Sequence, residues 1–127
     1  MTRNEYIQRA EAARIFSLDK RWRRLANGLP DLSPCPFCPL EATLRMELNK
    51  KGIEPDVCWD LCPFKSCSSQ DLESLYGRYT SADPDSPQEL KAVQAIVDFL
   101  EDLNVVTWAD ELLAMNFLEE DKEDELR

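Results

Sequence analysis

The sequence contains no histidine among its 127 residues. This absence excludes Ser-His and Cys-His nucleophile pairs, because both need an imidazole as the general base. It also excludes zinc sites that use histidine, including those of the HExxH metalloproteases and the zinc deaminases. Since no pair of Asp, Glu, Cys or Lys residues has a spacing that suggests catalysis, we predict that the protein is not an enzyme.

Long apolar runs are also missing from the sequence. No run approaches the ~18 residues that would cross a bilayer, and no signal-peptide core follows the first residues. We therefore expect no membrane partner and a cytoplasmic location. Thiols stay reduced in the cytoplasm, so the five cysteines indicate metal binding rather than disulfide bonds. Their odd number also does not suit a fully paired disulfide framework.

Acidic residues outnumber basic ones, and the net charge of -10 is unevenly distributed. Residues 1–30 carry seven basic and three acidic side chains, whereas residues 101–127 carry two basic and ten acidic ones. An acidic body disfavours general binding to nucleic acid. The basic N-terminal segment is therefore the one part of the chain in which we expect phosphate to be tolerated.

Hydrophobic spacing predicts a mainly α-helical protein. The sequence Thr2-Arg3-Asn4-Glu5 has the form of a capping box, and a helix should follow it. We expect Ser17 and Asp19 to interrupt that helix, and Asn27-Gly28 to end its continuation. The predicted buried side chains are Tyr6, Ile7, Ala10, Ala13 and Phe16, followed by Leu18, Trp22, Leu25 and Leu29.

Shorter helices are predicted beside the cysteines. One should begin at Pro39 and end at Lys50, Lys51 and Gly52, with Leu40, Leu44 and Leu48 along its buried side. Another should begin between Ser68 and Asp71 and bury Leu72, Leu75, Tyr76 and Tyr79.

The last third of the sequence predicts two helices. Ser86-Pro87-Gln88-Glu89 supplies an N-cap, a proline in the first turn and a capping glutamate. Residues 107–110 should cap the second helix. The predicted buried sides are Leu90, Val93, Ile96, Val97, Leu100 and Leu103, then Trp108, Leu112, Met115 and Leu118.

Taken together, these patterns predict an N-terminal helix, a Cys-rich metal knuckle with short helices, and a C-terminal two-helix hairpin. We place the helix and the metal-binding region in residues 1–82, and the hairpin packed on them in 83–120. Residues 121–127 should form an acidic tail.

The cysteines follow the pattern C-x2-C, then 19 residues, then C-x3-C, then four residues to the fifth cysteine. Two thiolate pairs at such spacing can surround one soft divalent cation, as in zinc ribbons. Most of these thiols lie in proline-rich sequence with little helical pattern, where buried core cysteines are least expected. The predicted metal ligands are Cys35, Cys38, Cys58, Cys62 and Cys67.

Two questions about this site stay open at the level of the sequence. Cys35 and Cys38 form one half of it, and the other half is two ligands from Cys58, Cys62 and Cys67, of which we favour Cys62. Zinc is the favoured metal, but an all-sulfur site also suits an iron–sulfur cluster. The Cys-Pro pairs occur in cluster ligation as well, although no ferredoxin-type C-x2-C-x2-C spacing is present.

The region from about residue 18 to residue 80 resembles small Cys-rich metal-binding proteins of tailed phages and prophages. The matching elements are Lys20-Arg21-Trp22, Cys35-Pro36-Phe37-Cys38-Pro39-Leu40, Cys58 with Cys62-Pro63, and Cys67. The second pair here is C-x3-C, where that family has C-x2-C. The resemblance implies a metal-binding phage protein, and it implies no particular activity.

Residues 20–24 place four basic side chains around a tryptophan. Lys20, Arg21, Trp22, Arg23 and Arg24 could hold phosphate and stack a base, or contact a partner protein. We favour the alternative, in which the tryptophan is a core residue and the basic side chains form a solvated face.

The sequence therefore predicts a non-enzymatic, zinc-stabilised interaction or regulatory protein with a protein partner. The alternatives are an iron–sulfur protein, such as a small accessory subunit of a redox enzyme, and an acidic inhibitor or decoy of a nucleic-acid-binding protein.

Overall fold

The computed structural model describes residues 1–32, 35–55, 61–64 and 74–121. The regular structure in these ranges is helical, apart from an isolated bridge between Thr2 and Glu119. The predicted mainly α-helical class is therefore confirmed. Over the same ranges, no helix combines the length and the apolar character needed to cross a membrane.

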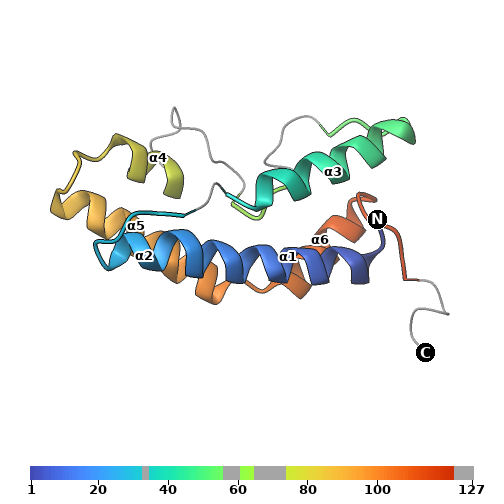
Figure 1. Ribbon diagram of the computed structural model, residues 1–127. Coiled ribbons are helices and arrows are strands. Elements are labelled where there is room, and N and C mark those ends of the chain that lie inside the picture. The colour runs from blue at the N-terminus through green and yellow to red at the C-terminus, as the bar shows by residue number, and fades with distance from the viewer. Residues whose placement is uncertain (33–34, 56–60, 65–73, 122–127) are drawn as a thin grey trace.

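Helix α1 (Arg3–Ser17), π-helix η1 (Leu18–Trp22) and α2 (Arg23–Ala26) follow one another as a continuous rod (Figure 1). The rod begins at the predicted capping box, where the Thr2 hydroxyl accepts a hydrogen bond from the Glu5 amide at 3.2 Å. The predicted interruption at Ser17 and Asp19 is wrong. The chain passes that point in a π turn, in which the Arg23 amide donates to the Leu18 carbonyl.

The π turn changes which side chains of the rod are buried. It adds one residue to a turn, so Ser17 and Leu18 can both face the core although they are neighbours in sequence. Tyr6, Ala10 and Ala13 are buried as predicted. Phe16 is 46% exposed, and the prediction that it would be buried is wrong.

The rod ends where the sequence predicted. Gly28 has a φ of 74°, a left-handed conformation that glycine adopts at little cost, and the Leu29 amide turns back to the Arg24 carbonyl at 2.8 Å. Leu29 then lies beyond the helix and is 49% exposed. Its predicted place on the buried stripe is therefore wrong, because the helical periodicity stops before it.

Helix α3 (Phe37–Lys50) packs on α1. It begins two residues before the predicted start at Pro39, and it buries Leu40, Leu44 and Leu48 as predicted. Gly52, with a φ of 78°, follows its end.

Helix α4 (Leu75–Ser81) is capped by Ser74, whose hydroxyl accepts a hydrogen bond from the Gly77 amide at 2.9 Å. The predicted start between Ser68 and Asp71, and Leu72, lie outside the described residues. Leu75, Tyr76 and Tyr79 are half-buried instead of buried, and the rings of Tyr76 and Tyr79 pack against Trp22 of η1.

The predicted C-terminal hairpin is present as α5 (Pro87–Asp102) and α6 (Val105–Ala114). The Ser86 hydroxyl accepts a hydrogen bond from the Glu89 amide at 3.2 Å, which confirms the predicted cap of α5. Helix α5 packs against η1, α2 and α4, whereas α6 packs against α1 (Figure 1). One hydrophobic core therefore joins the hairpin to the N-terminal rod.

Three details of the hairpin differ from the prediction. Helix α6 begins at Val105, because the Asn104 side chain accepts from the Thr107 amide and caps the helix earlier than residues 107–110 would. Met115 is 44% exposed, because the helix ends at Ala114 and the chain turns there. Leu90, on α5, is 54% exposed instead of buried.

The chain after α6 returns to the start of α1. The Arg3 amide donates to the Glu119 carbonyl at 2.9 Å, and the Asn4 amide donates to the Asp121 carboxylate at 2.7 Å. Asp121, the first residue of the predicted acidic tail, therefore lies at the positive end of a helix, where a carboxylate is favoured. Residues 122–127 lie outside the described residues.

A buried hydrogen bond links α1 to α6, because Trp108 Nε1 donates to the Tyr6 hydroxyl at 2.9 Å. Tyr6→Phe should lower the free energy of unfolding by about 1–3 kcal/mol, since it leaves the indole N–H without its acceptor. Urea denaturation measures this as a lower midpoint with an unchanged slope. Tyr76→Phe is the control, since within the described ranges the Tyr76 hydroxyl accepts just one long hydrogen bond, from Arg21 at 3.4 Å. Equal decreases in the free energy of unfolding for Tyr6→Phe and Tyr76→Phe would contradict a stabilising role for the hydrogen bond between Trp108 and Tyr6.

Candidate metal centre

The first cysteine pair lies in the turn that leads into α3. The Cys38 amide donates to the Cys35 carbonyl at 3.3 Å, so residues 35–38 form a tight turn. Phe37, between the two cysteines, is 1% exposed and belongs to the core. Cys35 is partly buried against that core, whereas Cys38 is exposed. The buried phenylalanine therefore fixes the position of both thiols relative to the helices.

The segment around Cys62 is fixed in the same way. Leu61 and Pro63 are buried, and Cys62 packs against the core. The Phe64 ring lies between Phe37, at 5.8 Å between ring centroids, and Phe99 of α5, at 5.0 Å. The rings of Phe37 and Phe64 meet edge to face, a favourable geometry for aromatic pairs, whereas those of Phe64 and Phe99 are tilted by 32°. The packing of Phe37 on Phe64 therefore places the first cysteine pair and Cys62 in adjoining segments.

A signal of this arrangement is present in the sequence, and the sequence analysis missed it. Cys-Pro-Phe occurs twice, at residues 35–37 and 62–64. In both copies the phenylalanine is the residue that anchors the segment, and the two rings meet. The repeat therefore places Cys35 and Cys62 each two residues before a phenylalanine that packs in the core.

The charge of Cys62 acts on the buried hydroxyl of Tyr6. Burial raises the pKa of Tyr6 well above its usual value; the hydrogen bond from Trp108 acts in the opposite direction, and the negative charge of Cys62 adds to the rise. Cys62 itself is partly buried and packs against the hydrophobic core. A cation bound at Cys62 would thus be anchored to the main core.

The structure places three of the five predicted ligands, and Cys58 and Cys67 lie outside the described residues. Among the residues that it describes, no three Cys, Asp, Glu or His side chains are grouped closely enough to hold a metal ion. A four-thiolate site in this chain would therefore need Cys58 or Cys67. The ligand set itself stays a prediction.

Residues 20–24, the predicted nucleic-acid or partner contact, include the buried side chain of Trp22. Trp22 is 2% exposed, and its ring makes edge contacts with Tyr76 and Tyr79 at centroid distances of 6.4 and 5.1 Å. A base cannot stack on a ring that the protein covers. The favoured interpretation of Trp22 as a core residue is therefore confirmed.

The arginines of this segment contact groups of the same chain. The Arg21 guanidinium lies 4.6 Å from the centroid of the Trp22 ring. Arg23 forms an ion pair with Asp19 at 2.7 Å, and Arg24 donates to the Pro30 carbonyl at 2.8 Å. Lys20 is exposed. These contacts favour a structural role for the arginines over a phosphate-binding one.

The chemistry of the site follows from its donor atoms. Cysteine thiolates suit a soft cation with tetrahedral preference, such as zinc.

No protein-family model, curated protein sequence or solved structure matches this chain.

Proposed function

We propose that this protein is a non-enzymatic interaction or regulatory module, of phage origin, in which zinc stabilises the Cys-rich region. The observation that carries the proposal is the contact between Phe37 and Phe64 at 5.8 Å. The contact joins the segments that bear Cys35, Cys38 and Cys62, and binding of one ion would require these thiols to draw closer together than they lie here and to be joined by Cys58 or Cys67.

Support for a structural role of the metal comes from the size and composition of the fold. The chain has 127 residues, and two of its cysteine-bearing segments contribute large aromatic side chains to the core. A metal that fixes these segments would hold those rings in place. The phage origin rests on the resemblance of residues 18–80 alone.

Support for an interaction role comes from the surface. The net charge of -10 suits a partner with basic character, and it disfavours nucleic acid itself. The arginines of residues 21–24 are engaged with their own chain, which weakens the case for a phosphate contact there.

Metal analysis of the protein purified without air and without chelators tests the proposal. We expect one zinc per chain by elemental mass spectrometry and no absorption in the visible range. A brown protein with iron and acid-labile sulfide, absorbing near ~400 nm, would replace zinc with the iron–sulfur alternative. A folded protein with neither metal would refute both.

A further inference from the structure

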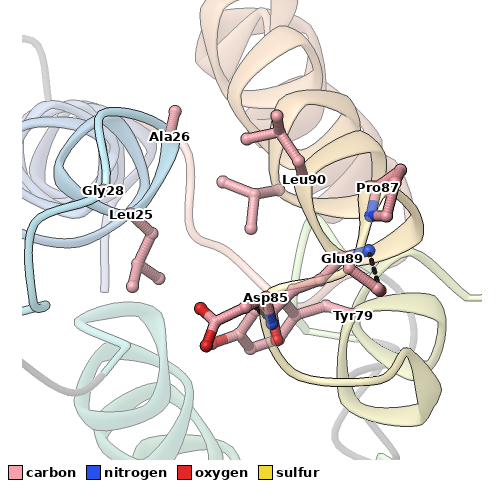
Figure 2. Close-up of a pocket in the computed structure, with 10 residues that line it drawn as sticks. Leu25, Ala26, Gly28, Tyr79, Asp85, Pro87, Glu89 and Leu90 are labelled. Carbon is pink, nitrogen blue, oxygen red and sulfur yellow. Dashed lines mark hydrogen bonds between the residues drawn. The ribbon is translucent and has the colours of Figure 1, made fainter.

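A hollow of about 490 Å³ lies where α4 and the start of α5 approach the end of α2. Its walls are largely apolar and include Leu25, Ala26, Leu90 and Val93. Figure 2 shows Leu25 and Leu90 extending from α2 and α5 into the space between these helices. The hollow is therefore large enough to accept one or two apolar side chains.

Leu90 is not needed to complete the core at this point. It is 54% exposed although it stands on the predicted buried stripe of α5, and Leu29, just after α2, is 49% exposed. Of these two leucines, Leu90 lines the hollow, and an exposed leucine in a concave surface favours contact with another molecule. Leu90 supplies the apolar half of such a contact.

The polar side of the hollow is acidic. Asp85 and Glu89 both line it, and its lining contains no Lys or Arg. Neither carboxylate forms an ion pair within the described residues. Tyr79 also lines the hollow. Its pKa is raised mainly by burial, and the negative charge of Glu89 raises it further.

We propose that this hollow binds a basic amphipathic segment of a partner protein. An apolar side chain of the segment enters between Leu25 and Leu90, and neighbouring Lys or Arg side chains meet Asp85 and Glu89. The inference names the partner class of the interaction protein proposed above and rests on that interaction role, but it does not require zinc.

The negative charge of the hollow favours a basic segment over a nucleic acid, an acidic peptide or a second copy of this chain. A nucleic acid or an acidic peptide would bring negative charge to two unpaired carboxylates in a molecule of net charge -10. A second copy of this chain would bring a surface of net negative charge, since the chain carries a net charge of -10. A basic segment with leucine-like side chains complements both halves of the hollow.

The test uses the full chain and a synthetic helical probe of 14 residues, with leucines at i, i+3, i+4 and i+7 and arginines beside them. Amide NMR shifts locate the binding, and fluorescence anisotropy measures the affinity at low salt. We expect saturable shifts concentrated around residues 25–29, 79 and 85–93. A matched probe with glutamates in place of the arginines should not bind.

Two substitutions remove the acidic side of the hollow without disturbing its backbone. Asparagine tolerates the φ of 60° found at Asp85, and glutamine can keep the hydrogen bond that Glu89 accepts from the Asp85 amide. Asp85→Asn with Glu89→Gln should weaken the probe about two- to tenfold, as expected for two exposed ion pairs. The loss should shrink as salt is added.

Control variants separate the hollow from the general acidity of the surface. Asp98→Asn with Glu120→Gln makes the same change in net charge at exposed positions away from the hollow, and it should leave the affinity within twofold. Leu90→Ser should weaken the probe about tenfold, whereas Met46→Ser, at a 62% exposed position on α3, should not.

Equal weakening by the control pair, or shifts spread over other surfaces, would overturn the proposal, as would failure of the probe to bind. A dimer in sedimentation that Leu90→Ser converts to monomer would assign the hollow to a second copy and also overturn it. All of these outcomes are independent of the zinc content, so a failure here is distinguishable from a failure of the metal site.

Discussion

Trp22→Ala is expected to lower the free energy of unfolding by about 3–5 kcal/mol, the range for truncating a buried aromatic side chain. Trp22 lies in η1, which packs against α5, and it contacts both tyrosines of α4. Removing the indole thus leaves a cavity bounded by three elements. The Arg21 guanidinium would also lose the ring over which it lies.

Chemical denaturation followed by circular dichroism measures this loss. Trp22→Phe should cost much less, because a ring remains and because Trp22 Nε1 has no hydrogen-bond partner in the described part of the chain. Lys20→Ala, at an exposed neighbouring position, should change stability by no more than about 0.5 kcal/mol. A Trp22→Ala protein as stable as the wild type would contradict the role of Trp22 as a core residue. It would favour the alternative, in which Trp22 stacks on a nucleic-acid base.

Helix starts and ends were predictable where a local signal sets them. The capping box at Thr2, the cap and proline at Ser86 and Pro87, and the left-handed Gly28 each place a helix boundary through contacts within a few residues. The apolar stripe of α3 was equally visible, because a regular helix keeps its spacing.

The errors have tertiary or irregular causes. A π turn at Leu18–Trp22 breaks the 3.6-residue period, so spacing alone could not show that Ser17 would be buried and Phe16 exposed. The exposure of Leu90 depends on how closely α2 approaches α5, which no local pattern encodes. Helix α6 is capped by Asn104 and not by residues 107–110, because the Asn104 side chain accepts a hydrogen bond from the Thr107 amide.

For the candidate site, the cysteine ligands stay a prediction, and the structure adds one contact between their segments. Spacing identified the cysteines, but the contact that joins their segments is made by phenylalanines far apart in the sequence. The duplicated Cys-Pro-Phe was the available signal. Which of Cys58 and Cys67 completes the site stays a prediction.

Cys62→Ser is expected to abolish stoichiometric zinc binding and to lower the free energy of unfolding by more than about 4 kcal/mol, as loss of a structural metal does. The physical reason is that zinc needs four thiolates here, and three cannot close the tetrahedron. Cys35→Ser and Cys38→Ser should have the same effect. Cys35→Ser combined with Cys62→Ser should lower the free energy of unfolding little more than either substitution alone, because each one already removes the metal.

A chelator separates loss of zinc from the local effect of a buried hydroxyl. EDTA should lower the melting temperature of the wild-type protein toward that of Cys62→Ser and leave the variant unchanged. Lower pH should also release zinc, because protons compete for the thiolates. Comparing Cys58→Ser with Cys67→Ser then identifies the fourth ligand, since the variant that retains zinc has lost a non-ligand. Wild-type stability unaffected by EDTA, with Cys62→Ser still strongly destabilised, would assign Cys62 to the core beside Tyr6 and Phe64 and remove zinc from the account of this fold.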